Sequence, residues 1–247
     1  LLPNVAQAVT AGDSLLGAPL LTSSNPLVCN AAAFRAAGVV TYPSTWEDVT
    51  EMAPLFTEKG MYALTYSADP GQTLNMSFYP LLWQAGGSVF DADEQVAFNS
   101  PQGIRALEFL TGLARGNALE PDSLTTAVNT EQTEFAAGRS GCTWSIPAVD
   151  LVPVLGEENV VVLPPLIDEQ SVAYGTVGSL SLLKSSRNKE AAGRFAAFAT
   201  DPVNSIDYLR AGGYFSPAAG ATPLYAGSPL QSRVEQTLPT VRFGEQN

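Results

Sequence analysis

Apolar residues along this chain follow two patterns, short continuous runs and the three-and-four spacing of an amphipathic helix. The helical spacing recurs at Val49, Met52, Ala53 and Phe56, and again at Ile104, Leu107, Leu110 and Ala114. Because residues three and four apart share one face of a helix, both segments are predicted to be helices with one buried face. Residues 160–163 form a β-branched run typical of a buried strand, and residues 177–183 read as another.

Capping residues mark where the predicted helices begin and end. Asn30 and Thr45 are suited to accept hydrogen bonds from the free amides of a first turn, and Asp48 completes a capping box with Thr45. Gly38 and Gly60 are expected to end these two helices. The helices predicted in this way cover residues 30–38, 45–60, 75–85, 100–116, 133–137, 188–202 and 202–212. The predicted strands cover residues 15–21, 27–29, 62–66, 141–146, 160–163 and 177–183, with a hairpin at 88–98.

Strands that alternate with helices predict an α/β fold with a largely parallel sheet. Phe195 and Phe198 are expected to face inward from the Ala-rich helix that Asn188 caps. A chain of 247 residues has room for one large domain or two smaller ones.

Charge and composition exclude several classes of function. The chain carries 24 acidic and 12 basic side chains, a net charge of -12, and it contains no histidine. Such an acidic chain is not expected to bind nucleic acid or anionic lipid. Without histidine, His-based catalysis and His metal ligation are excluded, and neither a P-loop nor a nucleophile elbow is present. We therefore expect no catalytic residue, no metal and no cofactor.

The two cysteines, Cys29 and Cys142, both lie in apolar runs. The simpler interpretation is two buried small hydrophobic residues, and the alternative is a disulfide formed in an oxidising compartment. No apolar run approaches the length of a transmembrane helix. The first residues lack the basic start and long apolar core of a signal peptide, so a signal segment is not expected within this chain.

Several ordered motifs resemble one family. Thr45-Trp46-Glu47-Asp48 is similar to its "T-W-D-E" helix start, Leu82-Trp83-Gln84-Ala85-Gly86-Gly87 to its "G-G" turn, Phe135 to Cys142 to its "F-x-x-G-K-A-A-M" step, and Lys184 to Ala192 to its "S-K-N-K-E-A-A" step. In this order and spacing, the motifs resemble the extracytoplasmic solute-binding proteins of ABC transporters, in the sugar-binding family that includes maltose-binding protein. Two departures are that Cys29 stands where Tyr is usual, and that Ile146 and Ala148 fall where the family has "G-x-W".

The resemblance implies a periplasmic-binding-protein-like fold of two α/β lobes with a cleft and a hinge. One lobe would hold residues 1–40 and 166–211, and the other would hold residues 41–160 and 212–247. The hinge crossings would lie near residues 39–43, 160–166 and 211–215. No counterpart of the family's opening portion is found, so the N-terminal lobe is expected to be incomplete and to expose apolar surface, either at Leu15, Leu16, Leu20 and Leu21 or on residues 177–183.

A sugar site requires aromatic faces and a few polar groups of fixed geometry. Tyr79 and Trp83 share one helix face, and the resemblance places that helix against the cleft. Each aromatic residue could instead pack in the core. Asn75 could instead cap the helix that follows it, and Gly178 could instead form a turn that enters a strand. The candidate ligand-binding residues are Asn75, Tyr79, Trp83, Trp144, Tyr174, Gly178, Ser179, Tyr214 and Phe215.

The implied function is that of the substrate-binding component of a bacterial ABC importer. It would capture a mono- or oligosaccharide and deliver it to the transmembrane permease subunits, from the periplasm or from a lipid anchor at the cell surface. One alternative is a carbohydrate-active hydrolase, which needs two carboxylates in one cleft. The acidic residues here instead fall in helix first turns or loops, such as Glu47, Asp91 and Glu157. A sensor or adaptor module with the same fold is the other alternative.

Overall fold

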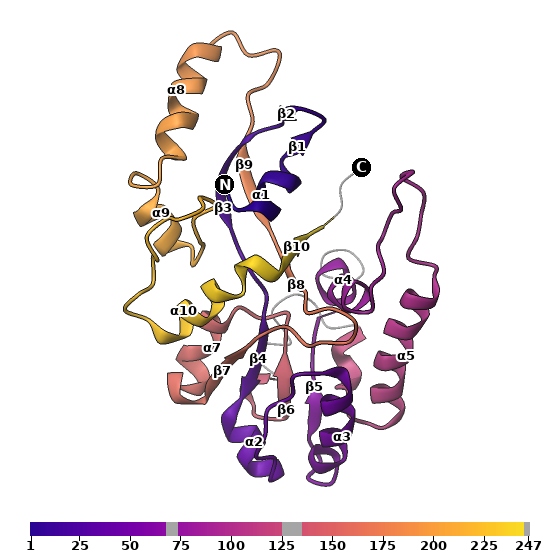
Figure 1. The fold of residues 1–247 in the computed structure, drawn as a ribbon. Helices are drawn as coiled ribbons and strands as arrows, with labels where there is room; N and C mark the ends of the chain where they lie inside the picture. The colour runs from indigo at the N-terminus through magenta and orange to yellow at the C-terminus, as the bar shows by residue number, and fades with distance from the viewer. Residues whose placement is uncertain (68–73, 125–134, 245–247) are drawn as a thin grey trace.

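A four-stranded sheet forms the centre of the lower part of the molecule in Figure 1. Its order is β5 (Tyr62–Leu64), β6 (Ser140–Thr143), β4 (Leu27–Asn30) and β7 (Val160–Leu163). The computed structural model describes residues 1–67, 74–124 and 135–244. The predicted strands at 27–29, 62–66, 141–146 and 160–163 are thus all present, within one sheet.

The directions of these strands correct the prediction of a largely parallel sheet. β5 and β6 are parallel, but β4 is antiparallel to both β6 and β7. β4 carries the chain down into this sheet from β3 (Ala18–Thr22), whereas β5, β6 and β7 all run back up (Figure 1). Helix–strand alternation fixes the direction of strands joined by helices, but not that of the strand by which the chain enters.

A disulfide joins the two central strands. Cys29 of β4 and Cys142 of β6 lie directly opposite each other, with Cα atoms 4.0 Å apart, and both side chains are fully buried. The favoured interpretation as separate hydrophobic residues was wrong, and the alternative of a disulfide is what the structure shows. Strand register brings the two together across 113 residues of sequence.

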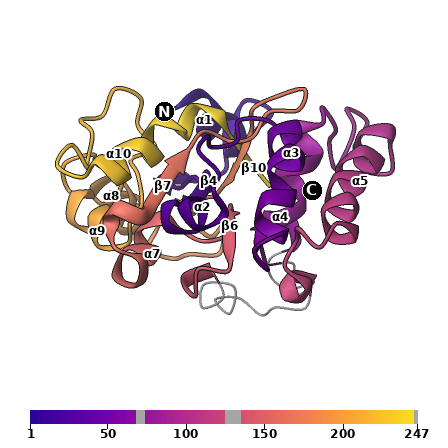
Figure 2. The same ribbon diagram turned by 90° about the horizontal axis from the view of Figure 1, so that it is seen from below.

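Helices cover both faces of the four-stranded sheet (Figure 2). On one side lie α2 (Ala31–Ala37), α3 (Trp46–Thr57), α4 (Leu74–Gln84) and α5 (Pro101–Arg115), and on the other lie α7 (Ala148–Leu155) and α10 (Pro229–Gln236). Period-two alternation divides β4 between the two cores, because Leu27 and Cys29 face the first cluster and Val28 the second.

Local sequence explains the helix ends. Asn30 Oδ1 accepts from the amides of Ala32 and Ala33, and Thr45 and Asp48 form the predicted capping box. Gly38 ends α2 with a φ of 75°, in the left-handed region that glycine adopts without strain. Of the helix predicted at 133–137, residues 133 and 134 lie outside the described residues, while Phe135 and Ala136 are helical.

In the upper part of the molecule, β3 pairs antiparallel with β9 (Val177–Leu180), and this two-stranded pair is called here the upper ribbon. Around it lie α1 (Pro3–Ala8), the hairpin of β1 (Thr10–Ala11) and β2 (Ser14–Leu15), α8 (Lys189–Ala199) and α9 (Ile206–Ala211) (Figure 1). Pro202 lies in a turn rather than at a helix start, because the Asp201 side chain accepts from the two amides that follow Pro202.

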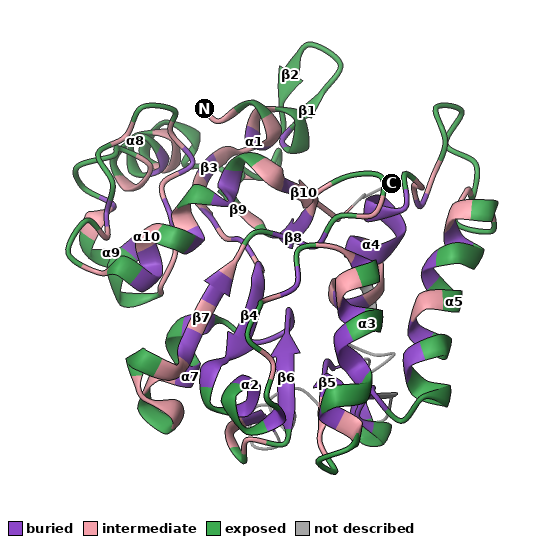
Figure 3. Ribbon diagram, turned by 60° about the horizontal axis from the view of Figure 1, so that its bottom comes forward, coloured by how far each residue is buried: buried purple, intermediate pink, exposed green. Residues whose placement is uncertain are grey.

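Several large apolar residues of the upper part are exposed, and Figure 3 colours the β1–β2 hairpin as exposed. Leu15 and Leu16 are exposed as predicted, together with Leu182 and Leu183, whereas Leu20 and Leu21 are half-buried. Phe195 and Phe198 were expected to face inward, but they are 63% and 62% exposed. The helical pattern correctly places them on one face of α8, but no described element covers that face. Asn188 precedes α8 without a side-chain capping bond.

Two further strands lie between the two parts. β8 (Ala173–Gly175) pairs in parallel with β10 (Val241–Phe243), and isolated bridges join Asn25 to Tyr174 and Thr22 to Phe215. The chain therefore passes between the upper ribbon and the four-stranded sheet within residues 23–26 and again within residues 164–176. Residues 164–176 are called here the connecting segment, and residues 23–26 and 164–176 are called the two crossings. A further passage, from α9 in the upper part to α10 on the lower part, lies within residues 212–228.

This pairing differs from the predicted lobe boundary near residue 40. β4 and α2 belong to the four-stranded sheet and its helices, so residues 27–37 pack with residues assigned to the other lobe. Residues 39–43 join α2 to α3, and both helices pack on the same sheet, so no crossing lies there. The boundary was predicted from the order of the family motifs, which does not indicate which strands pair with each other.

Candidate functional site

The carboxyl ends of β5, β6 and β7 lie at one edge of the four-stranded sheet, below the two crossings. Tyr66 and Ser67 follow β5, Trp144 and Ser145 follow β6, and residues 164–166 follow β7. Open α/β sheets bind ligands outside the carboxyl ends of their strands. This edge is therefore the candidate site.

A stacked aromatic pair lies at this edge. The rings of Tyr66 and Trp144 have centroids 5.4 Å apart and planes within 12° of parallel, and both side chains are buried. Trp144 Nε1 donates to the carbonyl of Ser77 in α4 at 3.0 Å. Burial raises the pKa of Tyr66 to about 12, so its hydroxyl stays protonated at neutral pH.

Small hydroxyl side chains surround this pair, and sequence reasoning missed them. Thr65 Oγ1 donates to Glu120 Oε2 at 2.7 Å, and Ser145 Oγ accepts from the amide of Ser67 at 3.2 Å. The Ser77 hydroxyl donates to the carbonyl of Ser67, which ties α4 to the end of β5. The available signal was polar residues directly after predicted strands, a pattern that ordinary loops share.

A second aromatic group lies where α4 meets β8. Trp83 and Tyr174 stack with centroids 6.1 Å apart and planes within 3°, and Tyr79 lies 5.6 Å from Trp83 at a tilt of 54°. The Arg242 guanidinium, from β10, is 5.0 Å from the centre of the Trp83 ring. Burial raises the pKa of Tyr174, and the neighbouring Tyr79 raises it further.

Burial separates the roles available to these aromatics. Trp83 is fully buried and Tyr174 nearly so, whereas Tyr79 is half-buried. A ring stacks on a sugar only through an open face, so the burial of Trp83 favours the packing role that the sequence left open. Tyr79 remains the aromatic of this group with accessible surface.

The other predicted residues lie elsewhere or have no described side chain. A Cβ on Gly178 would meet the Leu21 side chain at 2.8 Å, so the close approach there is to the paired strand; Ser179 is exposed on the same strand. Phe215 is buried in the second core cluster, and the Tyr214 carbonyl accepts from the Tyr225 hydroxyl. Asn75 lies in α4, but its side chain is outside the described residues.

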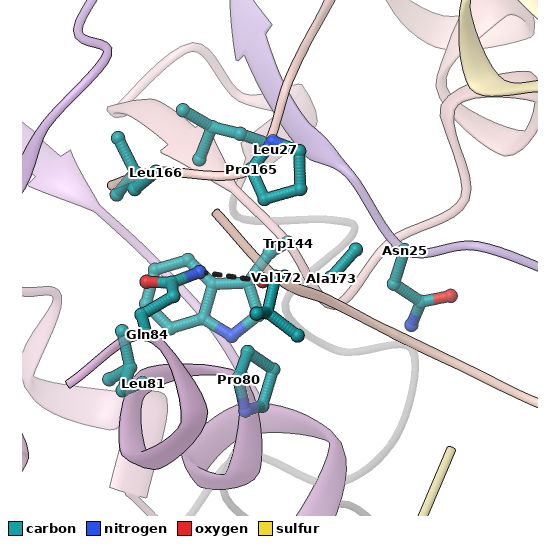
Figure 4. A pocket seen from close by; sticks show the side chains of 10 residues that line it. All are labelled: Asn25, Leu27, Pro80, Leu81, Gln84, Trp144, Pro165, Leu166, Val172 and Ala173. Carbon is teal, nitrogen blue, oxygen red and sulfur yellow. Dashed lines mark hydrogen bonds between the residues drawn. The ribbon is translucent and has the colours of Figure 1, made fainter. Parts of the chain in front are cut away.

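A small cavity of about 10 Å³ lies beside Trp144, between α4 and the connecting segment (Figure 4). It is large enough for roughly one water molecule. Its lining comes from α4, the sheet edge and both crossings, and comprises Asn25, Leu27, Pro80, Leu81, Gln84, Trp144, Pro165, Leu166, Val172 and Ala173.

A larger open hollow of about 440 Å³ lies between the end of α4 and the start of α5. Its charged lining residues, Arg105 and Glu169, are ion-paired to each other at 3.0 Å. Among residues 1–67, 74–124 and 135–244, no group of three or more acidic, Cys or His side chains could hold a metal ion. No described helix has the length and apolarity needed to cross a membrane.

Comparison with protein families gives a match to the model of the bacterial extracellular solute-binding proteins over residues 1–205. Among curated proteins, a probable amino-acid ABC transporter periplasmic-binding protein of Sinorhizobium fredii is 28% identical over 102 residues. That alignment covers 40% of this chain and 24% of the relative.

Several solved structures share the fold. T. maritima MalE3 has a TM-score of 0.81 and 21% identity, with 100% of this chain and 66% of that chain covered. The GacH receptor of Streptomyces glaucescens has a TM-score of 0.79 and 20% identity, with 98% and 63% covered. A sugar transporter protein of Arthrobacter chlorophenolicus has a TM-score of 0.79 and 15% identity, with 98% and 63% covered. The chain thus spans somewhat less than two thirds of these proteins' length.

Proposed function

The chain belongs to the bacterial extracellular solute-binding protein family, and from that premise we propose that it serves as the substrate-binding component of an ABC importer. In this proposal it captures a carbohydrate between its two parts and delivers it to the transmembrane permease subunits. Binding, rather than catalysis, is the activity proposed.

The observation that carries the proposal is the half-buried Tyr79 ring beside the Trp83–Tyr174 stack, at the junction of α4 with the connecting segment. A sugar presents apolar C–H faces to an aromatic ring and hydroxyls to polar groups. The buried hydroxyl side chains and Glu120 at the neighbouring sheet edge hydrogen-bond within the protein, so they support the sheet edge rather than contact the ligand. The side chain that we assign to the ligand is Tyr79, and the buried Trp83–Tyr174 stack beside it supports that ring.

The comparisons favour a carbohydrate over other solutes. The MalE3 structure contains maltose, the GacH receptor was solved with acarbose, and the Arthrobacter protein contains laminaribiose. The Sinorhizobium relative is instead named for amino acids, but it matches 40% of the chain. Amino acids therefore belong in any screen as the competing class of ligand.

Extracytoplasmic location fits the buried Cys29–Cys142 disulfide. Disulfides persist in the periplasm and at cell surfaces and are rare in the cytosol of mesophiles. Location outside the cytoplasm, in the periplasm or at the cell surface, is therefore part of the proposal.

A thermal-shift screen tests the proposal on the purified protein. Maltose, maltotriose, laminaribiose and single hexoses would be compared with a set of amino acids. A ligand at 100 times its dissociation constant stabilises the native state by about 2.7 kcal/mol, which for a chain of this size raises Tm by roughly 5–11 °C. A rise with a saccharide and none with amino acids is expected. The reverse result would reject the carbohydrate assignment, and no rise with any solute would reject the binding role.

A further inference from the structure

The connecting segment is fastened to the lower part along its length, beginning at the first turn of α3. The amide of Ile167 donates to the carbonyl of Ser44 at 2.9 Å, and the amide of Trp46 donates to the carbonyl of Ile167 at 3.1 Å. These bonds hold the connecting segment against the capped end of α3.

Ion pairs to α5 form the next attachment. Arg105 contacts Asp168 at 2.5 Å and Glu169 at 3.0 Å. The Asp168 side chain is 10% exposed, whereas the Arg105 side chain is 52% exposed. The guanidinium therefore covers a mostly buried carboxylate and holds this turn on α5.

Gln84, the last residue of α4, makes the densest set of contacts to the connecting segment. Its carbonyl accepts from the amides of Glu169 and Gln170 at 2.8 and 3.0 Å. Its side-chain Nε2 donates to the carbonyl of Val172 at 2.9 Å, as Figure 4 shows, while Oε1 accepts from Trp46 Nε1 at 2.8 Å. The side chain is 5% exposed, so these bonds are shielded from water.

The neighbouring Trp83 adds a further contact between α4 and the connecting segment, through its stack with Tyr174. Its stack with Tyr174 lies two residues beyond Val172 on the connecting segment, and Arg242 contacts Trp83 from the strand beside β8. The last turn of α4 thus contacts the connecting segment through the side-chain amide of Gln84 and through the ring of Trp83.

After Tyr174 the connecting segment contacts residues 22 and 23 instead of the helices of the lower part. Thr176 is exposed and hydrogen-bonds to Thr22, at the end of β3, and to Ser23 of the other crossing. The amide of Ser23 donates to the carbonyl of Thr176 at 2.9 Å, and the two hydroxyls are 2.8 Å apart. Directly above this point begins the upper ribbon, with Thr22 opposite Val177.

From these contacts we infer that Gln84 is a positioning residue, which fastens residues 167–174 to α4 and so places the pivot between the two parts at Ser23 and Thr176. The crossing predicted near residues 160–166 overlaps the connecting segment only at residues 164–166, because residues 160–163 form β7 and are paired in the four-stranded sheet. The inference deepens the proposed function by naming the residue that sets where the cleft hinges.

Hydrogen exchange of the unliganded protein tests the inference, with Gln84→Met compared to wild type. The substitution keeps the length of the side chain but leaves the Val172 carbonyl and Trp46 Nε1 without their buried partner. We expect the amides of Ser23 and Asn25, which bond to Thr176 and Tyr174, to exchange about tenfold faster relative to core amides such as Val49. The matched control is Gln231→Met, since Gln231 is a buried glutamine in α10, and it should leave this ratio unchanged.

Arg105→Met provides a second variant that does not rely on a buried side chain. It should speed exchange at Glu169 and Gln170, while the amides of the sheet keep their wild-type protection. Acceleration that is uniform over all amides, or equal in the Gln84 and Gln231 variants, would overturn the positioning role. Neither experiment needs a ligand. A failed sugar screen alongside a localised exchange pattern would therefore reject the proposed function and keep this inference.

Discussion

Replacement of both Cys29 and Cys142 by alanine removes the covalent link between β4 and β6. Both sulfur atoms lie in the core of the four-stranded sheet, and both residues are 0% exposed. The strands remain paired by register on either side of the link, so the native fold is expected to persist. The change therefore acts largely on the unfolded chain, which loses a long closed loop.

The size of the effect follows from the length of that loop. The linked residues are 113 positions apart, and the chain-entropy model assigns a loop of this length about 4.8 kcal/mol of stabilisation at 25 °C. Measured losses for native disulfides are about 2–5 kcal/mol. That is a large share of the roughly 5–15 kcal/mol by which native proteins are stable, so the variant should unfold at a markedly lower urea concentration.

Urea unfolding of the oxidised wild type, the reduced wild type and the double alanine variant measures this loss. The reduced protein and the variant should lose similar free energy, because both lack the cross-link. A thiol titration in urea without reductant should find no free thiol in the oxidised protein. Two free thiols in that titration would show that the disulfide is absent. A loss of stability below about 1 kcal/mol, where the chain-entropy model gives about 4.8 kcal/mol, would show that the cross-link does not stabilise the fold in this way.

Three further predictions concern single side chains. Trp83→Ala should cost about 3–5 kcal/mol in urea unfolding because the ring is fully buried; a loss below about 1 kcal/mol would contradict its place in the core. The pKa of Asp48 lies below its usual value of 3.8, chiefly through the backbone hydrogen bond from Ser44. Its contribution to stability is thus complete above that value and disappears as pH falls through the lowered folded-state pKa. The stability gap between wild type and Asp48→Asn, measured by urea unfolding, should accordingly shrink between about pH 5 and pH 2, and a constant gap would refute this. Phe195→Ser should change the free energy of unfolding by no more than about 0.5 kcal/mol because Phe195 is 63% exposed, and a loss several times larger would show that the α8 face is packed.

Local features of the fold could be predicted from the sequence because their causes lie within a few residues. The Asn30 cap, the Thr45–Asp48 capping box and the Gly38 stop each depend on a side chain and amides at most a few positions away. The sheet partners of β4 depend instead on segments more than a hundred residues later. Strand direction, the disulfide and the crossing positions all follow from that pairing, and each was mispredicted or left open.

Only part of the candidate site could be predicted, because some of its contacts depend on nearby residues and others on distant strands. The spacing of Tyr79 and Trp83 correctly put both on α4, and their rings are in contact. Which ring stays accessible depends on Tyr174 and Arg242, which come from strands far along the chain. Glu120 gave no signal in the sequence, because its burial follows from the pairing of its backbone with β5.

Calorimetric titration of maltose or laminaribiose into wild type, Tyr79→Ala and Tyr42→Ala tests whether the protein binds a saccharide through Tyr79. Tyr42 is the matched control, since it is also half-buried but packs on Phe34, between α2 and α3. Loss of an aromatic stack worth about 1 kcal/mol weakens binding about fivefold. We predict saccharide binding by the wild type, at least that loss in Tyr79→Ala, and unchanged affinity in Tyr42→Ala. Equal affinity in all three proteins, or no saccharide binding by the wild type, would contradict the account.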